Sequence, residues 1–277
     1  MTKYRTLYLL IILLFLAGGL FFWRALSPSG KLPEAGMAGS NGNEAMTALD
    51  RPDICEETVF EGARASLCII DPAANATRLV YRDRTGVPHG SVKRAVTALA
   101  TFGQTPVLAM NAGMYHSDMT PVGLYVEDGK EISPLNTDDD FGNFFLKPNG
   151  VFFIRPDGTA GVMETMAYAG AEIAPAFATQ SGPMLVINGE IHPRFLPDGT
   201  TRYIRNGVGV RTDGKLVLAI TRDPVSLGSF ARLFRDVAMC PNALFFDGGV
   251  SSMAWGAHME IDAGEPAGPV VVVMLRD

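Results

Sequence analysis

The chain has 277 residues, of which 47% are hydrophobic, so it can bury the core of one large domain or two small ones. We expect one main domain. The formal net charge is −6 and lysines and arginines are not clustered, which argues against nucleic acid as a partner. Thirty glycines and eighteen prolines, spread through the chain, predict many turns and a strand-rich fold.

The N-terminal region contains an apolar stretch, residues 7–23, that carries no charge. Lys3 and Arg5 precede it and Arg24 follows it, a pattern typical of a signal peptide or a single membrane anchor. A small-residue cleavage site exists at 36–38, but it lies well beyond the apolar run. We therefore expect an uncleaved anchor over residues 1–24.

The positive charges before this stretch predict that the N-terminus stays in the cytoplasm and the rest of the chain crosses the membrane. The predicted location is the inner (cytoplasmic) membrane, single-pass, with the domain on the periplasmic side. Residues 25–52 include a run rich in Gly, Pro, Ser and Ala, which predicts a flexible linker. The folded domain is expected over residues 53–277.

Three cysteines follow, and export would favour disulfides among them. Cys55 and Cys68 flank Glu61-Gly62, which fits a two-residue hairpin turn. If Phe60 pairs with Ala63, the register brings Cys55 opposite Cys68, within reach of a disulfide. The alternative is two buried free thiols. Cys240 is interpreted as a small apolar residue at a helix end.

The remaining elements predict an α+β domain with a mixed or antiparallel sheet, many hairpins and a few helices. Ser91 can cap a helix that ends at Gly103, and Ser229 can cap a second helix that ends before Pro241. Asn-Gly, Asp-Gly and Pro-containing turn signals fill the middle of the chain. Strands are expected at 79–82, 107–110, 184–187, 216–221, 243–246 and 270–275.

Two of these strands run directly into loops with polar residues. The strand 243–246 leads into Asp247, Gly248 and Gly249, and the strand 107–110 leads into Asn111 and Gly113. Glycines in such loops let the backbone come close to a ligand. The two strand ends therefore suggest one shared pocket.

Several segments together resemble the phosphodiester glycosidase domain family. They occur in the family's order, and the resemblance runs from about Cys55 to the C-terminus. That family includes the enzyme that uncovers mannose 6-phosphate by removing N-acetylglucosamine, and many exported bacterial proteins associated with exopolysaccharide. The segments are residues 111–115 with 121–124, 142–144 with 148–151, 180–185, 205–210 and 247–252.

The resemblance implies cleavage of the bond between a sugar anomeric carbon and a phosphodiester oxygen. The departing phosphate monoester has a second pKa of about 6, so a general acid is less necessary than a cation that receives phosphate. Arg205 is the candidate for that cation, and its alternative is a surface arginine on an edge strand. Asp247 is the candidate carboxylate, and its alternative is a turn that bonds Gly249.

Further residues of these segments are predicted to bind substrate. Asn111 could instead close an Asx-turn, and the two serines after Gly249 could instead cap a helix. Three consecutive carboxylates at 138–140 are interpreted as a solvated turn, so no metal and no cofactor is expected. The predicted substrate-binding residues are Asn111, Gly113, Gln180, Ser181, Gly182, Asn206, Gly248, Gly249, Ser251 and Ser252.

The sequence thus predicts an exported, membrane-anchored hydrolase that acts on sugar-1-phosphodiesters in envelope or exopolysaccharide glycans. Its partners would be the glycan substrate and the membrane. One alternative is a non-catalytic protein of polysaccharide binding or assembly with the same pocket. Another is a metal-dependent phosphodiesterase, which would need clustered His and Asp ligands that the sequence does not group.

Overall fold

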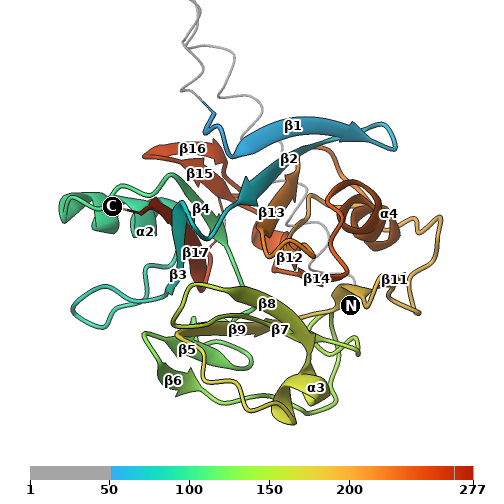
Figure 1. The fold of residues 1–277 in the computed structure, drawn as a ribbon, viewed down its shortest axis with the longest axis horizontal. Coiled ribbons are helices and arrows are strands. Elements are labelled where there is room, and N and C mark those ends of the chain that lie inside the picture. The colour runs from blue at the N-terminus through green and yellow to red at the C-terminus, as the bar shows by residue number, and fades with distance from the viewer. Residues whose placement is uncertain (1–50, 265, 277) are drawn as a thin grey trace, which may run out of the picture. The chain divides into compact units, whose positions relative to one another are not determined.

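The computed structural model describes residues 51–264 and 266–276, and these lie within one compact unit. Three sheets and a few short helices build it (Figure 1). Every strand pairing between described residues is antiparallel, which confirms the predicted α+β domain with many hairpins. The predicted anchor lies outside the described residues, and among these no helix is long and apolar enough to cross a membrane.

The largest sheet has seven strands and contains two of the segments that the family resemblance selected. Its hairpins are joined to one another by pairings between strands that lie far apart in the chain, such as β2 with β13 and β12 with β14. In spatial order its strands are β1 (Cys55–Phe60), β2 (Ala63–Ile70), β13 (Leu216–Thr221), β12 (Asn206–Val210), β14 (Asn242–Phe245), β10 (Met184–Ile187) and β11 (Glu190–Ile191).

The other two sheets have five strands each. One contains the C-terminal strand in its interior, as the uninterrupted apolar run predicts; its order is β16 (His258–Ile261), β15 (Met253–Trp255), β4 (Leu108–Asn111), β17 (Val270–Leu275) and β3 (Asn75–Val80). The third sheet is formed by the middle of the chain. Its order is β6 (Lys130–Ser133), β5 (Tyr125–Glu127), β9 (Phe177–Ser181), β7 (Gly150–Ile154) and β8 (Ala160–Glu164).

The helices are short, and the α-helices of the described chain pack against the sheets. Ser91 caps the first one as predicted, because its side chain accepts a hydrogen bond from the Arg94 amide at 3.2 Å. They are α2 (Val92–Thr101), α3 (Thr165–Ala169), α4 (Leu227–Arg232), the π-helical turn η1 (Leu233–Val237) that continues α4, and the 3₁₀ turn η2 (Gly248–Val250).

The start of α4 differs from the prediction. Ser226, not Ser229, is the N-cap, and its hydroxyl accepts a hydrogen bond from the Ser229 amide at 3.1 Å. Both serines can cap a helix, and the sequence pattern does not choose between them. The helix therefore begins three residues earlier, at Leu227, which brings its first turn to the cleft described below.

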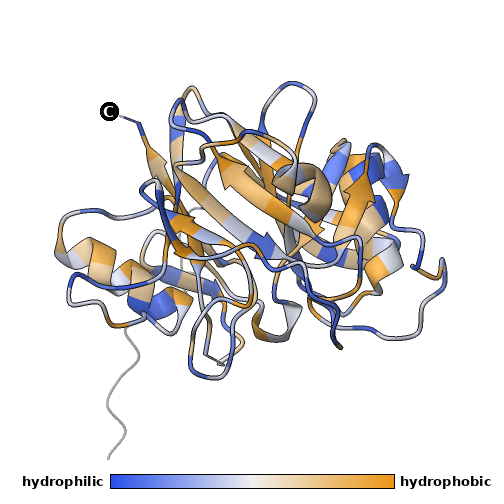
Figure 2. Ribbon diagram, turned by 90° about the horizontal axis from the view of Figure 1, so that it is seen from below, coloured by the Kyte–Doolittle hydropathy of each residue, from blue (hydrophilic) through white to orange (hydrophobic). Residues whose placement is uncertain are grey.

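The main core lies where the three sheets meet. Leu218 of the seven-stranded sheet, Met110 of β4 and Phe152 of β7 all belong to it and are fully buried. The ring of Phe152 packs edge-on against Phe246 with centroids 6.2 Å apart, which fixes the residue just before Asp247. Figure 2 shows the strands mainly in orange and the connecting loops largely in blue and white.

The N-terminal hairpin has the register that the sequence predicts. Phe60 lies opposite Ala63, and Cys55 lies opposite Cys68. The two cysteines form a disulfide with their Cα atoms 3.9 Å apart. The prediction of this bond is therefore confirmed, and Cys240 is a buried free thiol.

Candidate active site

The side chain of Asn111, the last residue of β4, joins three segments of the chain. Its Oδ1 accepts hydrogen bonds from Asn206 Nδ2 at 3.0 Å and from the Ser252 amide at 2.9 Å. Its Nδ2 donates to the Asp247 carbonyl at 2.8 Å. Because Asn111 is 1% exposed, these bonds replace the water that its amide would otherwise need. The two predicted strand ends therefore meet.

Asn206, the first residue of β12, completes this buried amide pair. Its Nδ2 also donates to the Asn111 carbonyl at 2.8 Å, and its Oδ1 accepts from the Ser251 hydroxyl at 3.3 Å. Both asparagines thus spend most of their hydrogen-bonding capacity within the protein. In the structure these two side chains hold the Asp247 loop in position. Their predicted contacts with a sugar have no support from this geometry.

Asp247 follows β14 and begins η2. Its Oδ1 accepts a hydrogen bond from the Gly249 amide at 3.2 Å, which is the turn predicted as the alternative to a chemical role. That bond uses one oxygen only, and Oδ2 has no partner among the described residues. The carboxyl group is half-buried, and this burial raises the pKa of Asp247 above its ordinary value, although the Gly249 amide opposes the shift.

The residues after Asp247 hold the loop in shape. The Ser251 hydroxyl donates to the Gly248 carbonyl at 3.1 Å, and the Ser252 hydroxyl accepts from the Ala263 amide at 3.0 Å. A side chain at Gly248 would lie 2.5 Å from the Phe245 ring, so this glycine serves packing. Gly249 is exposed and has room around it. Of the two glycines predicted to let a ligand approach the backbone, Gly249 alone is open in this way.

Arg205 lies just before β12 and is 3% exposed. Its Nε donates to the Val225 carbonyl at 2.8 Å and its Nη2 to the Thr201 carbonyl at 3.2 Å, while Nη1 has no partner among the described residues. No carboxylate of the described chain pairs with it. Burial therefore lowers the pKa of Arg205 to about 10, although Tyr203 opposes the shift, and the guanidinium remains charged at neutral pH.

Arg205 lines an open cleft of about 490 Å³. Asn143 comes from another of the family-like segments and lines the same cleft, and Arg194 adds a second cation. Ser226 and Gly228 bring the first turn of α4 to the wall. Arg194, Tyr203 and Ser226 were not predicted from the sequence. The loop that carries Arg194 and Tyr203 has no recognisable pattern, and the one signal at Ser226 is that a serine can cap a helix.

Arg205 precedes β12 and Asp247 follows β14, and these two strands are neighbours. Gly207 lies opposite Phe245, and the Phe246 amide donates to the Asn206 carbonyl at 3.1 Å, so Arg205 and Asp247 are each one residue beyond this hydrogen-bonded pair. The two side chains form no ion pair, and Asp247 does not line the cleft of Arg205. The carboxylate of Asp247 and the guanidinium of Arg205 therefore lie at the ends of neighbouring strands but do not contact each other.

The segment around Gln180 lies in the scaffold. Gln180 is 1% exposed, and its Oε1 accepts from the Leu124 and Asn136 amides at 3.0 and 2.9 Å. A side chain at Gly113 would lie 2.1 Å from Thr179 Oγ1, and one at Gly182 would lie 2.6 Å from the Phe144 carbonyl. Gly113 thus lets the second and third sheets approach closely, whereas Gln180 and Gly182 pack against loops of the third sheet. All three are buried and offer no open surface to a sugar.

Ser181 is the exception within that segment. It is fully buried, and its hydroxyl has no hydrogen-bond partner among the described residues. Its predicted contact with substrate stays a prediction, since nothing in the surrounding geometry opens a path to it.

The arrangement of these segments agrees with a comparison to known families. A sequence model described as phosphodiester glycosidase matches residues 104–274. The chain belongs to this family. The matched range contains Asn111, Arg205 and Asp247, so the buried amide pair, the unpaired cation and the free carboxylate oxygen all lie inside a phosphodiester glycosidase domain.

Individual relatives are between 12% and 32% identical to this phosphodiester glycosidase domain. The Escherichia coli (strain K12) protein YigE is 32% identical over 184 residues, which are 66% of this chain and 71% of YigE. Among solved structures, the zebrafish N-acetylglucosamine-1-phosphodiester alpha-N-acetylglucosaminidase catalytic domain has a TM-score of 0.57 at 15% identity, covering 80% of this chain and 82% of that one. A Burkholderia pseudomallei K96243 protein has a TM-score of 0.51 at 12% identity, covering 78% and 74%. These structural likenesses establish a shared fold.

Proposed function

We propose that the protein is an exported, membrane-anchored hydrolase that cleaves the glycosidic carbon–oxygen bond of a sugar-1-phosphodiester in envelope or exopolysaccharide glycans. One observation carries this proposal. Arg205 is a buried guanidinium without a carboxylate partner, and it lines an open cleft. A buried cation without a counter-ion is costly, and a bound phosphate would supply the missing charge.

The roles of the two charged residues follow from the leaving group. A phosphate monoester departs as an anion without prior protonation, so Arg205 would stabilise it through the nitrogen that the protein leaves free. Asp247 would act at the anomeric carbon or on water through Oδ2, which the Gly249 bond leaves available. Asn111 and Asn206 would hold the loop that sets the position of Asp247.

The export part of the proposal rests on two features. The disulfide between Cys55 and Cys68 suits an oxidising compartment, and it lies at the start of the domain, next to the predicted linker. The apolar residues 7–23 remain the proposed anchor.

A labelling experiment tests the reaction. The protein is incubated with sugar-1-phosphodiesters in ¹⁸O-water, and the products are analysed by mass spectrometry. Cleavage at carbon gives labelled sugar and unlabelled phosphate. Label on the phosphate would instead indicate attack at phosphorus and would contradict the glycosidase proposal.

Two substitutions test the roles. Asp247→Asn keeps the turn but loses the charge, so turnover should fall roughly a hundredfold or more while substrate binding survives. Arg205→Lys loses the planar fork and should impair phosphodiesters more than activated aryl glycosides. The matched controls are Asp262→Asn, which also accepts a hydrogen bond from a glycine two residues on, and Arg202→Lys, which is exposed. Full activity of Asp247→Asn would refute its role.

A second candidate function is polysaccharide binding without turnover. The observation that favours it is the separation of Asp247 from the cleft of Arg205. A binding protein needs the cleft but not the carboxylate. Unchanged glycan affinity in Asp247→Asn, with no turnover of any sugar-1-phosphodiester by the unsubstituted protein, would support this second function.

A further inference from the structure

We propose that the aglycone carried by the phosphate is apolar, of an alkyl or lipid type, and that it packs on Leu196 and Tyr203 beside Arg205. This inference rests on the proposed function, because it takes the cleft of Arg205 as the place of the phosphate. It adds the chemical class of the aglycone, which is the group attached to the phosphate opposite the sugar.

The first observation is exposure at the cleft. The side chains of Leu196 and Tyr203 are 72% and 59% exposed, and both line the cleft together with Arg205. Single exposed apolar residues are common on protein surfaces. Two of them on one cleft, next to a buried cation without a counter-ion, resemble a ligand site, where apolar walls surround a few polar groups.

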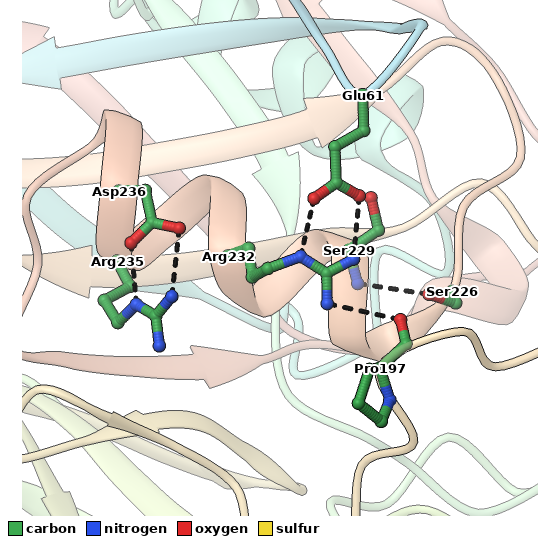
Figure 3. A network of polar contacts seen from close by, with 7 residues as sticks. All are labelled: Glu61, Pro197, Ser226, Ser229, Arg232, Arg235 and Asp236. Atoms are coloured by element: carbon green, nitrogen blue, oxygen red, sulfur yellow. Dashed lines mark hydrogen bonds and ion pairs between the residues drawn. The ribbon is translucent and has the colours of Figure 1, made fainter.

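The second observation is that the loop carrying Leu196 is held firmly. The Gly199 amide donates to the Leu196 carbonyl at 3.2 Å, and Arg232 Nη1 donates to the next carbonyl, that of Pro197, at 3.2 Å. Figure 3 shows Arg232 reaching Pro197 while it also pairs with Glu61 of the N-terminal hairpin. The exposure of Leu196 is therefore built into an anchored loop.

Tyr203 is fixed in the same way. Its amide donates to the Val225 carbonyl at 3.2 Å and its carbonyl accepts from the Val225 amide at 2.9 Å. Its ring lies 5.7 Å from the Arg205 guanidinium carbon. A phosphate on Arg205 would thus have an aromatic surface as its neighbour.

The chemistry of the two side chains selects the class of aglycone. An aromatic ring can pack against a sugar or an alkyl chain, but Leu196 has no group that could bond a hydroxyl. The hydroxyls of a sugar aglycone would lie against Leu196 without a hydrogen-bond partner there. An alkyl chain would instead remove the apolar surfaces of Leu196 and Tyr203 from water. The pair therefore favours an apolar chain.

The reaction keeps this group in the cleft. A water oxygen bonds to the anomeric carbon and gives up one proton to Asp247, which passes it to solvent. The bond from that carbon to the phosphate oxygen breaks, its electron pair stays on the oxygen, and the phosphate leaves with the aglycone still attached. The released product is then an alkyl phosphate. Simple alkyl phosphates are product analogues that bind without turnover.

The experiment compares methyl phosphate and hexyl phosphate by calorimetric titration of the full-length chain. Burial of part of the longer chain should make hexyl phosphate bind about tenfold tighter or more. Leu196→Ser and Tyr203→Ser should each reduce that ratio several-fold. Leu275→Ser is the matched control, since Leu275 is 71% exposed and lies on β17, outside the cleft, and the ratio should persist in it.

The outcomes separate this inference from the proposed function. Equal affinities for the two phosphates, absence of binding of both, or a ratio that survives in both cleft variants would overturn the inference. Rapid cleavage of methyl and hexyl sugar phosphodiesters at the same rate would leave the proposed function standing and this inference refuted. Preferential binding of hexyl phosphate without cleavage of any phosphodiester would show that the cleft binds an apolar phosphate but would refute the proposed function.

Discussion

Arg205 and Asp247 are both charged groups in surroundings that penalise their charge. Burial lowers the pKa of Arg205 and raises the pKa of Asp247. Neither group has an oppositely charged partner among the described residues. Charged side chains kept in such places are more typical of a functional site than of a packing core. The protein carries this electrostatic cost at two positions, just before β12 and just after β14.

The raised pKa of Asp247 predicts a stability effect with a definite sign. The folded-state pKa exceeds the ordinary value of 3.8, so the favourable contribution of the protonated form is fully present below pH 3.8 and is lost as pH rises through the folded pKa. At pH 7 the ionised carboxylate thus lowers stability. Asp247→Asn should raise the melting temperature at pH 7 and raise it less near pH 4.

Thermal unfolding at the two pH values checks this prediction. Asp262→Asn is again the control, since Asp262 is exposed and also accepts a hydrogen bond from a nearby glycine amide. A lower melting temperature for Asp247→Asn at pH 7 would show that the loop needs the charge for its own stability, and the interpretation of Asp247 as a functional carboxylate would lose this support.

At the scale of elements, local sequence patterns predicted the features that are set by residues close together in the chain. The register of the N-terminal hairpin, the helix capped by Ser91 and the interior strand β17 all follow from turn residues, caps and apolar periodicity. The partition into three sheets could not be predicted, because it depends on pairings such as β2 with β13 that cross long stretches of sequence.

The candidate site shows the same division. Two strand ends with polar loops predicted that Asn111 and Asp247 meet, and they do. That the Asn111 amide bonds Asn206 and Ser252 depends on contacts across 95 and 141 residues, which no local pattern encodes. The sequence therefore predicted which segments form the candidate site. The structure was needed to show which of their residues hold the Asp247 loop in place and which have polar groups free for a ligand.

The hairpin that begins the domain predicts a stability loss on reduction. The disulfide joins Cys55 and Cys68, 13 residues apart, and links the edge strand β1 to β2. A double Cys→Ser substitution should lower the free energy of unfolding by about 3 kcal/mol, because the open chain regains conformational freedom in the unfolded state. Denaturant unfolding in urea measures the change. A loss that also appears when Cys240→Ser alone is tested would point to packing, not to the cross-link.

For the whole molecule, the main prediction concerns topology. Residues 7–23 should remain in the mature protein, with everything after Arg24 outside the cytoplasm. Protease added to intact spheroplasts should then digest the domain while the protein fractionates with membranes. Recovery of a soluble periplasmic form with an N-terminus near Gly39 would contradict the anchor.

The position of β17 has a consequence for biogenesis. This strand is the last element of the chain, yet it pairs with β4 on one side and β3 on the other, and β4 ends in Asn111. Non-local pairings of this kind form slowly, and proteins made of them pass through aggregation-prone intermediates. A nascent chain that still holds β17 inside the ribosome cannot complete this sheet, so the backbone of β4 up to Asn111 gains its β17 partner only after β17 has emerged.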